Sequence, residues 1–268
     1  MKNQLHEFLK NQSASIDAKV EGKTLIDYID TNADEYADFP AINTPINDEY
    51  SGWDAMSWSE YRENIHNLAS CLIDIGLTPG DTAFIMSNNT KEHNISDLAI
   101  MHCGATPSTL YKQLKSGQIE YVANLMEAKV AVAGDLDLFH EIDKAKSDCP
   151  KLETIVVING YEEVKDIDYV VSYHELLQRG EDINANDDTL LRDAIKTVTP
   201  ESLACLIFTS GTTGNRKGVV ISQSAYVVPG LTLNMAMKYP HHKNRLIDLF
   251  FYAKENKYSH TNGVLGFW

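Results

Sequence analysis

Apolar residues recur along the chain in two alternating patterns, one with the spacing of a helix and one typical of a buried strand. The clearest helical segment follows Ser57-Trp-Ser-Glu60, which has the spacing of a capping box. Five apolar residues at helical spacing form one face of this segment: Tyr61, Ile65, Leu68, Leu72 and Ile75. Gly76 is expected to end the helix. A second amphipathic helix is predicted from Thr24, with an apolar face formed by Leu25, Tyr28 and Ile29.

Downstream of Gly76, predicted strands and helices alternate. The turn Pro79-Gly-Asp81 leads into a buried strand over 82–86. Further strands are predicted at 105–110, 129–133, 154–158 and 203–208, and helices at 91–103, 117–127 and 136–146. This order favours an α/β fold with a largely parallel sheet flanked by helices. The acidic group Asp182 to Asp188 is predicted to form a solvated loop, within a polar, acidic segment from Gly180 to Pro200 that leads into the strand at 203–208.

Composition narrows the classes of protein. The 268 residues, 43% of them hydrophobic, can bury the core of one large or two modest domains. A net charge of −15 opposes contact with a phosphate backbone, so we expect no nucleic-acid partner. The four cysteines, Cys71, Cys103, Cys149 and Cys205, are far apart and predict buried, reduced thiols without a zinc site or disulfides. No segment has the length of a membrane span or the core of a signal peptide, so a cytoplasmic location is expected.

The candidate chemistry lies in the run Leu206-Ile-Phe-Thr-Ser-Gly-Thr-Thr-Gly-Asn-Arg-Lys-Gly-Val-Val-Ile-Ser222. Glycines and hydroxyl residues between two apolar stretches are typical of loops that bind phosphate, with a lysine to offset the charge. A Walker A loop is excluded, because Arg216 stands at the second required glycine and Gly218 follows Lys217. A flexible surface turn is the alternative, since isolated glycine motifs are weak evidence. Located after the strand at 203–208, the loop is expected at the carboxyl edge of the parallel sheet.

The segment Thr209-Ser-Gly-Thr-Thr-Gly-x-x-Lys-Gly218 resembles the phosphate-loop signature of the adenylate-forming superfamily of acyl-CoA synthetases, acyl-activating ligases and luciferases. Arg216 departs from that pattern, since proline is usual there, and a further departure is Gln223, where the family commonly has histidine after the next strand. Other landmarks similar to the family follow in order from about Thr24 to Ser222. They include Met56-Ser-Trp-Ser-Glu-Tyr61, Asp97-Leu-Ala-Ile-Met-His-Cys-Gly-Ala-Thr-Pro107 and Gln118-Ile-Glu-Tyr121. The stretch Ala105–Leu110 looks closest to the fatty acyl-CoA ligase branch.

The resemblance implies a fold like the N-terminal subdomains of these enzymes. It also implies activation of a carboxylic acid, here a fatty acid, by ATP and Mg²⁺ to an acyl-adenylate, followed by transfer to coenzyme A. Seven residues would bind the ATP phosphates: Thr209, Ser210, Gly211, Thr212, Thr213, Gly214 and Lys217. His260 and Gly263 have the H-x-x-G spacing of the family's acyl and adenylate pocket, but their usual preceding context is missing, and an exposed loop histidine is the alternative. No metal ligand or catalytic residue is assigned.

The family's adenine, ribose and C-terminal lysine motifs are not found in the sequence and are expected downstream of residue 268. We therefore expect a polar extension over 1–23 and a truncated AMP-binding N-terminal domain over 24–268, without the C-terminal domain. Two hypotheses remain open. The chain is the N-terminal part of an AMP-forming ligase that is inactive without a complementing C-terminal half, or it is a non-catalytic remnant that binds a partner or, weakly, phosphate.

Overall fold

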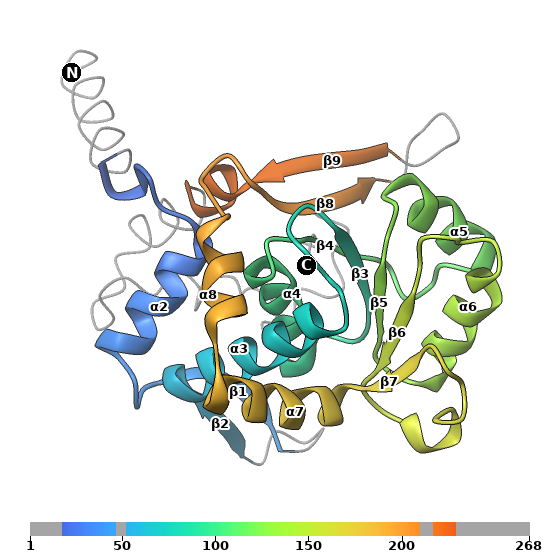
Figure 1. Cartoon of the computed structure of the whole chain (residues 1–268), viewed down its shortest axis with the longest axis horizontal. Helices are drawn as coiled ribbons and strands as arrows, with labels where there is room; N and C mark the ends of the chain where they lie inside the picture. The colour runs from blue at the N-terminus through green and yellow to red at the C-terminus, as the bar shows by residue number, and fades with distance from the viewer. Residues whose placement is uncertain (1–17, 47–51, 210–216, 229–268) are drawn as a thin grey trace.

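The computed structural model describes residues 18–46, 52–209 and 217–228, and a parallel sheet of five strands lies at its centre (Figure 1). The strand order is β4-β3-β5-β6-β7. The strands are β3 (Thr82–Met86), β4 (Thr106–Thr109), β5 (Val130–Ala133), β6 (Thr154–Val157) and β7 (Val170–Ser172). Because β3 is followed in the chain by one neighbour, β4, and is flanked on its other side by β5, the strand order reverses at β3. The predicted α/β class is therefore confirmed.

Helices cover both faces of this sheet. Because alternate residues of each strand point to opposite sides, the strands contribute to two cores, one on each face. Phe84 and Met86 of β3 face a core completed by α5 (Ser116–Leu125) and α6 (Leu136–Lys146). Ala83 and Ile85 face the larger core. That core includes residues of α2 (Leu25–Glu35), α3 (Trp58–Asp74), α4 (Lys91–His102), α7 (Tyr173–Asn186) and α8 (Thr189–Lys196). A short 3-10 helix, η1 (Tyr161–Glu163), precedes β7.

The helices α2 and α3 begin at the residues that the sequence indicates. The Thr24 side chain accepts a hydrogen bond from the backbone of Asp27, and the Asp27 carboxylate accepts one from the backbone of Thr24. Ser57 and Glu60 form the same reciprocal pair at the start of α3. Each box satisfies two backbone donors that a helix start would otherwise leave open. The capping box at Ser57 is therefore confirmed.

The strand that precedes the glycine-rich segment does not join the parallel sheet. β8 (Leu203–Thr209) pairs antiparallel with β9 (Lys217–Ser222) in a separate two-stranded sheet. This hairpin runs alongside β4 (Figure 1) and is linked to it by a 2.8 Å hydrogen bond from the Ser108 hydroxyl to the Leu206 carbonyl oxygen. The glycine-rich segment therefore follows a strand of this hairpin. The expectation that it follows a strand of the parallel sheet is wrong.

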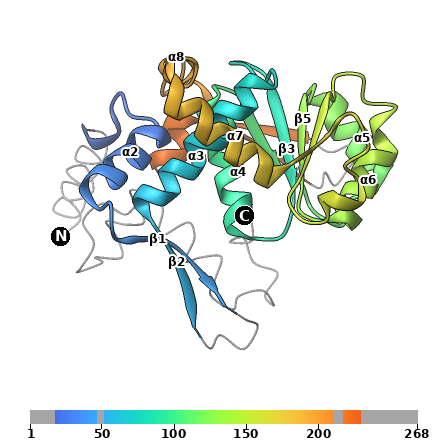
Figure 2. The same ribbon diagram turned by 60° about the horizontal axis from the view of Figure 1, so that its bottom comes forward.

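A second antiparallel hairpin precedes α3 and was not predicted. β1 (Pro40–Pro45) pairs with β2 (Trp53–Ser57), and the pair projects from the helical layer in the view of Figure 2. All residues of β2 are exposed or half-buried. The strand therefore contributes no buried residue that would mark it as part of the core.

The prediction of a solvated loop over 182–188, within the acidic segment 180–200, is also wrong. The segment completes α7 and forms α8, and Leu191 and Ala194 of α8 are buried in the helical layer. Gly180 faces the backbone of Asn67 in α3 so closely that an added Cβ would overlap its carbonyl group. The glycine therefore permits close packing of α7 on α3 instead of breaking the helix.

The four cysteines are all free and buried, as predicted. Cys71 lies in α3, Cys103 directly follows α4, Cys149 lies between α6 and β6, and Cys205 lies in β8. Burial raises the pKa of each thiol. All four thiols are therefore held protonated in the folded chain.

Candidate functional site: the β8–β9 hairpin

The β8–β9 hairpin brings together the two ends of the predicted phosphate-binding segment. Thr209 is the last residue of β8, and Lys217 is the first of β9. The two residues are direct partners in the antiparallel register. Ser210, Gly211, Thr212, Thr213 and Gly214, together with Arg216, lie outside the described residues. Their predicted phosphate contacts, like those of Thr209 and Lys217, stay predictions.

The end of the hairpin nearest this segment is held by packing within the pair of strands. Phe208 of β8 is buried and is the register partner of Gly218. A Cβ at Gly218 would lie 3.2 Å from Cε1 of Phe208, so the glycine leaves room for the ring across the neighbouring strand. Because Phe208 precedes Thr209 directly, this packing fixes the point at which the segment leaves β8.

The opposite end of the hairpin is tied to α2 by a residue that departs from the family pattern. The Gln223 side chain is fully buried, and its Oε1 atom accepts a 3.0 Å hydrogen bond from the backbone N–H of Leu25. This donor is one of those that a helix start cannot satisfy internally. Gln223 therefore has a structural role at the base of the hairpin, and its amide oxygen acts as an additional cap for α2.

Charge and exposure at the tip suit an anionic ligand. Lys217 is exposed and forms no ion pair with any residue that the structure describes. Farther along β9, Val219 and Val220 are 46% and 58% exposed. An exposed ammonium that is paired with no carboxylate among the described residues can attract an anion.

A second polar cluster lies at the carboxyl ends of β3 and β4, the edge of a parallel sheet at which ligands usually bind. The Ser87 hydroxyl is 2.7 Å from Nδ1 of His93, and Nε2 of His93 is 3.1 Å from the Thr109 hydroxyl. Lys112 donates a 2.5 Å hydrogen bond to the Asn88 side chain. Sequence reasoning did not single out this cluster, although polar residues directly after two neighbouring buried strands were a signal for it.

The other predicted pocket residues, His260 and Gly263, lie outside the described residues. Within residues 18–46, 52–209 and 217–228, no three or more His, Cys, Asp or Glu side chains gather in a way that could hold a metal ion. In the same part of the chain, no helix combines the length and apolar character needed to span a bilayer.

Comparisons with known proteins place the chain in a family. A family model described as AMP-binding enzyme matches residues 29–261. The long-chain-fatty-acid–CoA ligase heimdall of Drosophila melanogaster is 24% identical over 230 residues, which are 83% of this chain and 33% of that protein. Fatty acyl-CoA synthetase A of Dictyostelium discoideum is 30% identical over 226 residues, 77% of this chain and 31% of that protein. The chain thus spans about a third of the length of these relatives.

Solved structures agree on the fold. A long-chain-fatty-acid-CoA ligase from Archaeoglobus fulgidus has a TM-score of 0.63 at 22% identity, covering 80% of this chain and 39% of that one. An anthranilate CoA ligase in complex with anthranoyl-AMP has a TM-score of 0.65 at 20% identity, covering 78% of this chain and 36% of that one. The family match covers most of the sequence, and the relatives are acyl-CoA ligases. The chain therefore belongs to the family of AMP-binding enzymes and resembles the N-terminal part of AMP-forming acyl-CoA ligases.

Proposed function

We propose that this chain provides the pyrophosphate-binding part of the ATP site of a fatty acyl-CoA ligase. The observation that carries the proposal is the register of the hairpin, which sets Thr209 opposite Lys217 at the two ends of the glycine- and threonine-rich segment. A loop whose ends are held by a ladder of backbone hydrogen bonds loses less conformational entropy when it closes on a ligand. The names of the relatives support the choice of a fatty acid as substrate.

The physical task of this site is electrostatic. An acid can attack ATP only when an anionic carboxylate approaches an anionic phosphate, so positioning and neutralisation of charge dominate the barrier. Lys217 would contribute a positive charge beside the β- and γ-phosphates, and the hydroxyl of Thr209 would donate a hydrogen bond. Mg²⁺ is expected to accompany ATP, and coenzyme A to accept the acyl group. We assign no ligand for either among the described residues.

Two measurements test the proposal at different levels. The first is calorimetric titration of the chain with pyrophosphate and with ATP, comparing Lys217→Ala with Lys151→Ala. Lys151 is another exposed lysine, located before β6, and serves as the matched control. Loss of one charge-assisted contact should weaken pyrophosphate binding about tenfold in Lys217→Ala, whereas Lys151→Ala should bind as the parent does. Equal affinity of the two variants would remove Lys217 from the site.

The second measurement is fatty-acid-dependent exchange of pyrophosphate into ATP. We expect no exchange from the 268 residues alone, because they span about a third of the relatives. Joined to the remaining two thirds of a relative, the chain should support exchange, and Lys217→Ala should slow it. Pyrophosphate binding without exchange in this fusion would instead favour a non-catalytic phosphate-binding role.

A further inference from the structure

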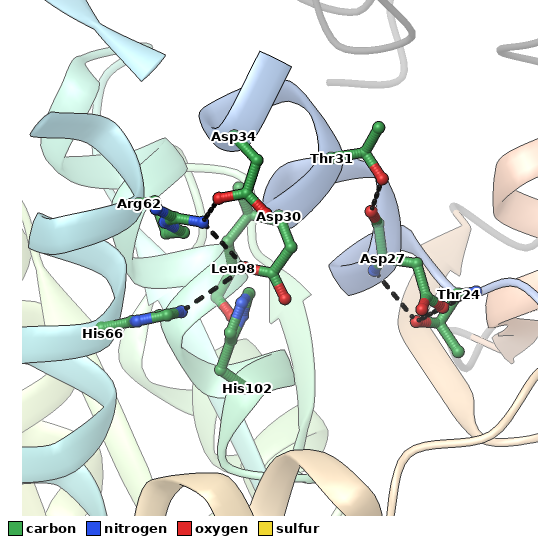
Figure 3. A network of polar contacts seen from close by, with 9 residues as sticks. All are labelled: Thr24, Asp27, Asp30, Thr31, Asp34, Arg62, His66, Leu98 and His102. Carbon is green, nitrogen blue, oxygen red and sulfur yellow. Dashed lines mark hydrogen bonds and ion pairs between the residues drawn. The ribbon is translucent and has the colours of Figure 1, made fainter. Parts of the chain in front are cut away.

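Two histidines lie side by side at the junction of three helices, away from the hairpin. His66 of α3 and His102 of α4 have ring centroids 5.4 Å apart, on the side of these helices that α2 covers (Figure 3). His102 is fully buried, and its Nδ1 atom donates a 2.7 Å hydrogen bond to the Leu98 carbonyl oxygen. Since a neutral imidazole carries one proton, this bond leaves Nε2 unprotonated. Nε2 of His102 has no hydrogen-bond partner among the described residues.

His66 is half-buried, and charged groups face it from α2, from α3 and from the start of α8. From α2, the nearest carboxylate oxygen of Asp30 is 4.0 Å from Nε2 of His66. On α3, Arg62 lies between Asp34, at 2.6 Å, and Asp30, at 3.9 Å (Figure 3). Near α8, Asp188 faces His66 but is itself paired at 2.9 Å with Arg192.

The surroundings of His102 are different. The only titratable group that acts on it appreciably within the described part of the chain is His66, and no carboxylate there pairs with it. An imidazolium at this position would be a buried cation beside a second imidazole ring, with no counter-ion among the described residues. Because the side chain is fully buried, it could gain solvent only if the helices packed around it moved apart.

We propose that the His66–His102 pair is an acid-sensitive latch, which keeps α2 docked on α3 and α4 while both rings are neutral and releases it when they gain protons. The apolar residues that hold α2, among them Leu25 and Ile29, would be the same at any pH. Only the polar part of the interface changes its charge. The latch therefore favours opening of α2 on its own, before the sheet unfolds.

The direction of the pH effect follows from the linkage between proton binding by the two histidines and the opening of α2. Burial, with a contribution from Arg62, lowers the pKa of His66 from 6.5 to about 4, and burial with the neighbouring His66 lowers the pKa of His102 to about 3. In the open state the pKa of each ring returns to its ordinary value. The open state thus binds more protons, and docking weakens as the pH falls below about 6.5. When the pH falls from 7 to 5, the ratio of open to docked states rises about 20-fold for each of the two histidines. Asp30 acts in the opposite sense, because burial raises its pKa.

Release of α2 would also reach the candidate site. The backbone N–H of Leu25, at the start of α2, is the donor that holds the side chain of Gln223 at the base of the β8–β9 hairpin. Undocking of α2 breaks this hydrogen bond and leaves the Gln223 amide open to water. The latch therefore links the protonation of two distant histidines to the anchoring of the hairpin.

The test is hydrogen exchange of the whole chain at pH 7 and pH 5, read by mass spectrometry as protection factors so that the intrinsic dependence on pH is removed. We expect peptides from α2 to lose at least 20-fold in protection at pH 5, while peptides from β3, β5 and β6 keep theirs. The variant His66→Gln/His102→Gln should show no such loss. His140→Gln, which removes an exposed histidine of α6, should behave as the parent chain.

Equal loss of protection in α2 and in the sheet would overturn the proposal, and so would an unchanged response in the double variant. If the double variant does not fold, the imidazole C–H resonances of the unmodified chain decide. Rings of His66 and His102 that stay neutral in the docked state at pH 5 support the latch. Titration of both near pH 6.5 without any change in α2 refutes it.

Discussion

Gly180 provides the sharpest test of how the helical layer is packed. The residue is buried in α7, against the backbone of α3, and a Cβ placed on it would overlap the carbonyl oxygen and carbon of Asn67. These are backbone atoms and cannot turn aside as a side chain would. Gly180→Ala must therefore push the two helices apart.

The cost can be worked from the contacts that this separation would disturb. Overpacking of a well-packed core costs about 1–3 kcal/mol. The Asn184 side chain, four residues along α7, donates a 2.8 Å hydrogen bond to Asn67 and accepts a 2.5 Å one from Ser70. Loss of these bonds adds about 1 kcal/mol each. The gain in helix propensity offsets about 1 kcal/mol. We expect a net loss of about 2–4 kcal/mol in the free energy of unfolding.

Urea denaturation followed by circular dichroism measures this loss, with Gly117→Ala as the matched control. Gly117 also lies within a helix, α5, but is exposed, and an added Cβ there would meet no atom within 4 Å. Its replacement should raise stability by up to about 1 kcal/mol through helix propensity alone. If Gly180→Ala were as stable as the parent, or shifted in the same direction as Gly117→Ala, the close contact of α3 and α7 would be refuted.

Two further predictions concern single polar contacts. Ser108→Ala removes the hydrogen bond from β4 to the Leu206 carbonyl oxygen of β8. The loss should lower the free energy of unfolding by about 1 kcal/mol and raise the rate of hydrogen exchange in β8. An unchanged exchange rate would count against this link between the strands. The pKa of Asp81 is lowered because, although burial raises it, hydrogen bonds from Thr78 and Lys129 outweigh burial. The contribution of Asp81 to the free energy of unfolding is therefore fully present at a pH above its ordinary pKa of 3.8. It is lost as the pH falls through the lower pKa of the folded state. Asp81→Asn should destabilise the chain at neutral pH, and the difference in urea midpoint should shrink in acid; a difference independent of pH would exclude the charged contact.

Local signals explain why much of the fold could be predicted from the sequence. The boxes at Thr24 and Ser57 fix where two helices begin, because the partner of each capping residue lies only three positions away. The buried strands are short apolar runs bounded by turns, and β3 spans the same residues as predicted. In these segments the pattern and the tertiary packing favour the same structure.

The missed features depend on contacts between distant segments. Gly180 and the acidic residues around it are typical of a loop, but the contact with Asn67 stabilises a helix there. The position of the β8–β9 hairpin beside β4 depends on contacts about 100 residues apart, such as the hydrogen bond from the Ser108 hydroxyl to the Leu206 carbonyl oxygen. The polar cluster of Ser87, His93 and Thr109 likewise forms only when two strands end at the same edge.

The four buried thiols give the chain its own probes of local motion. Cys71, Cys103, Cys149 and Cys205 sit in different parts of the fold and are inert while they stay covered, because only an exposed thiolate reacts quickly. Their rates of alkylation therefore measure how often each region opens. Peptide mapping after labelling would separate the helical layer, the segment after α6 and the β8–β9 hairpin without any added reporter group. An opening confined to the hairpin would label Cys205 before the other three.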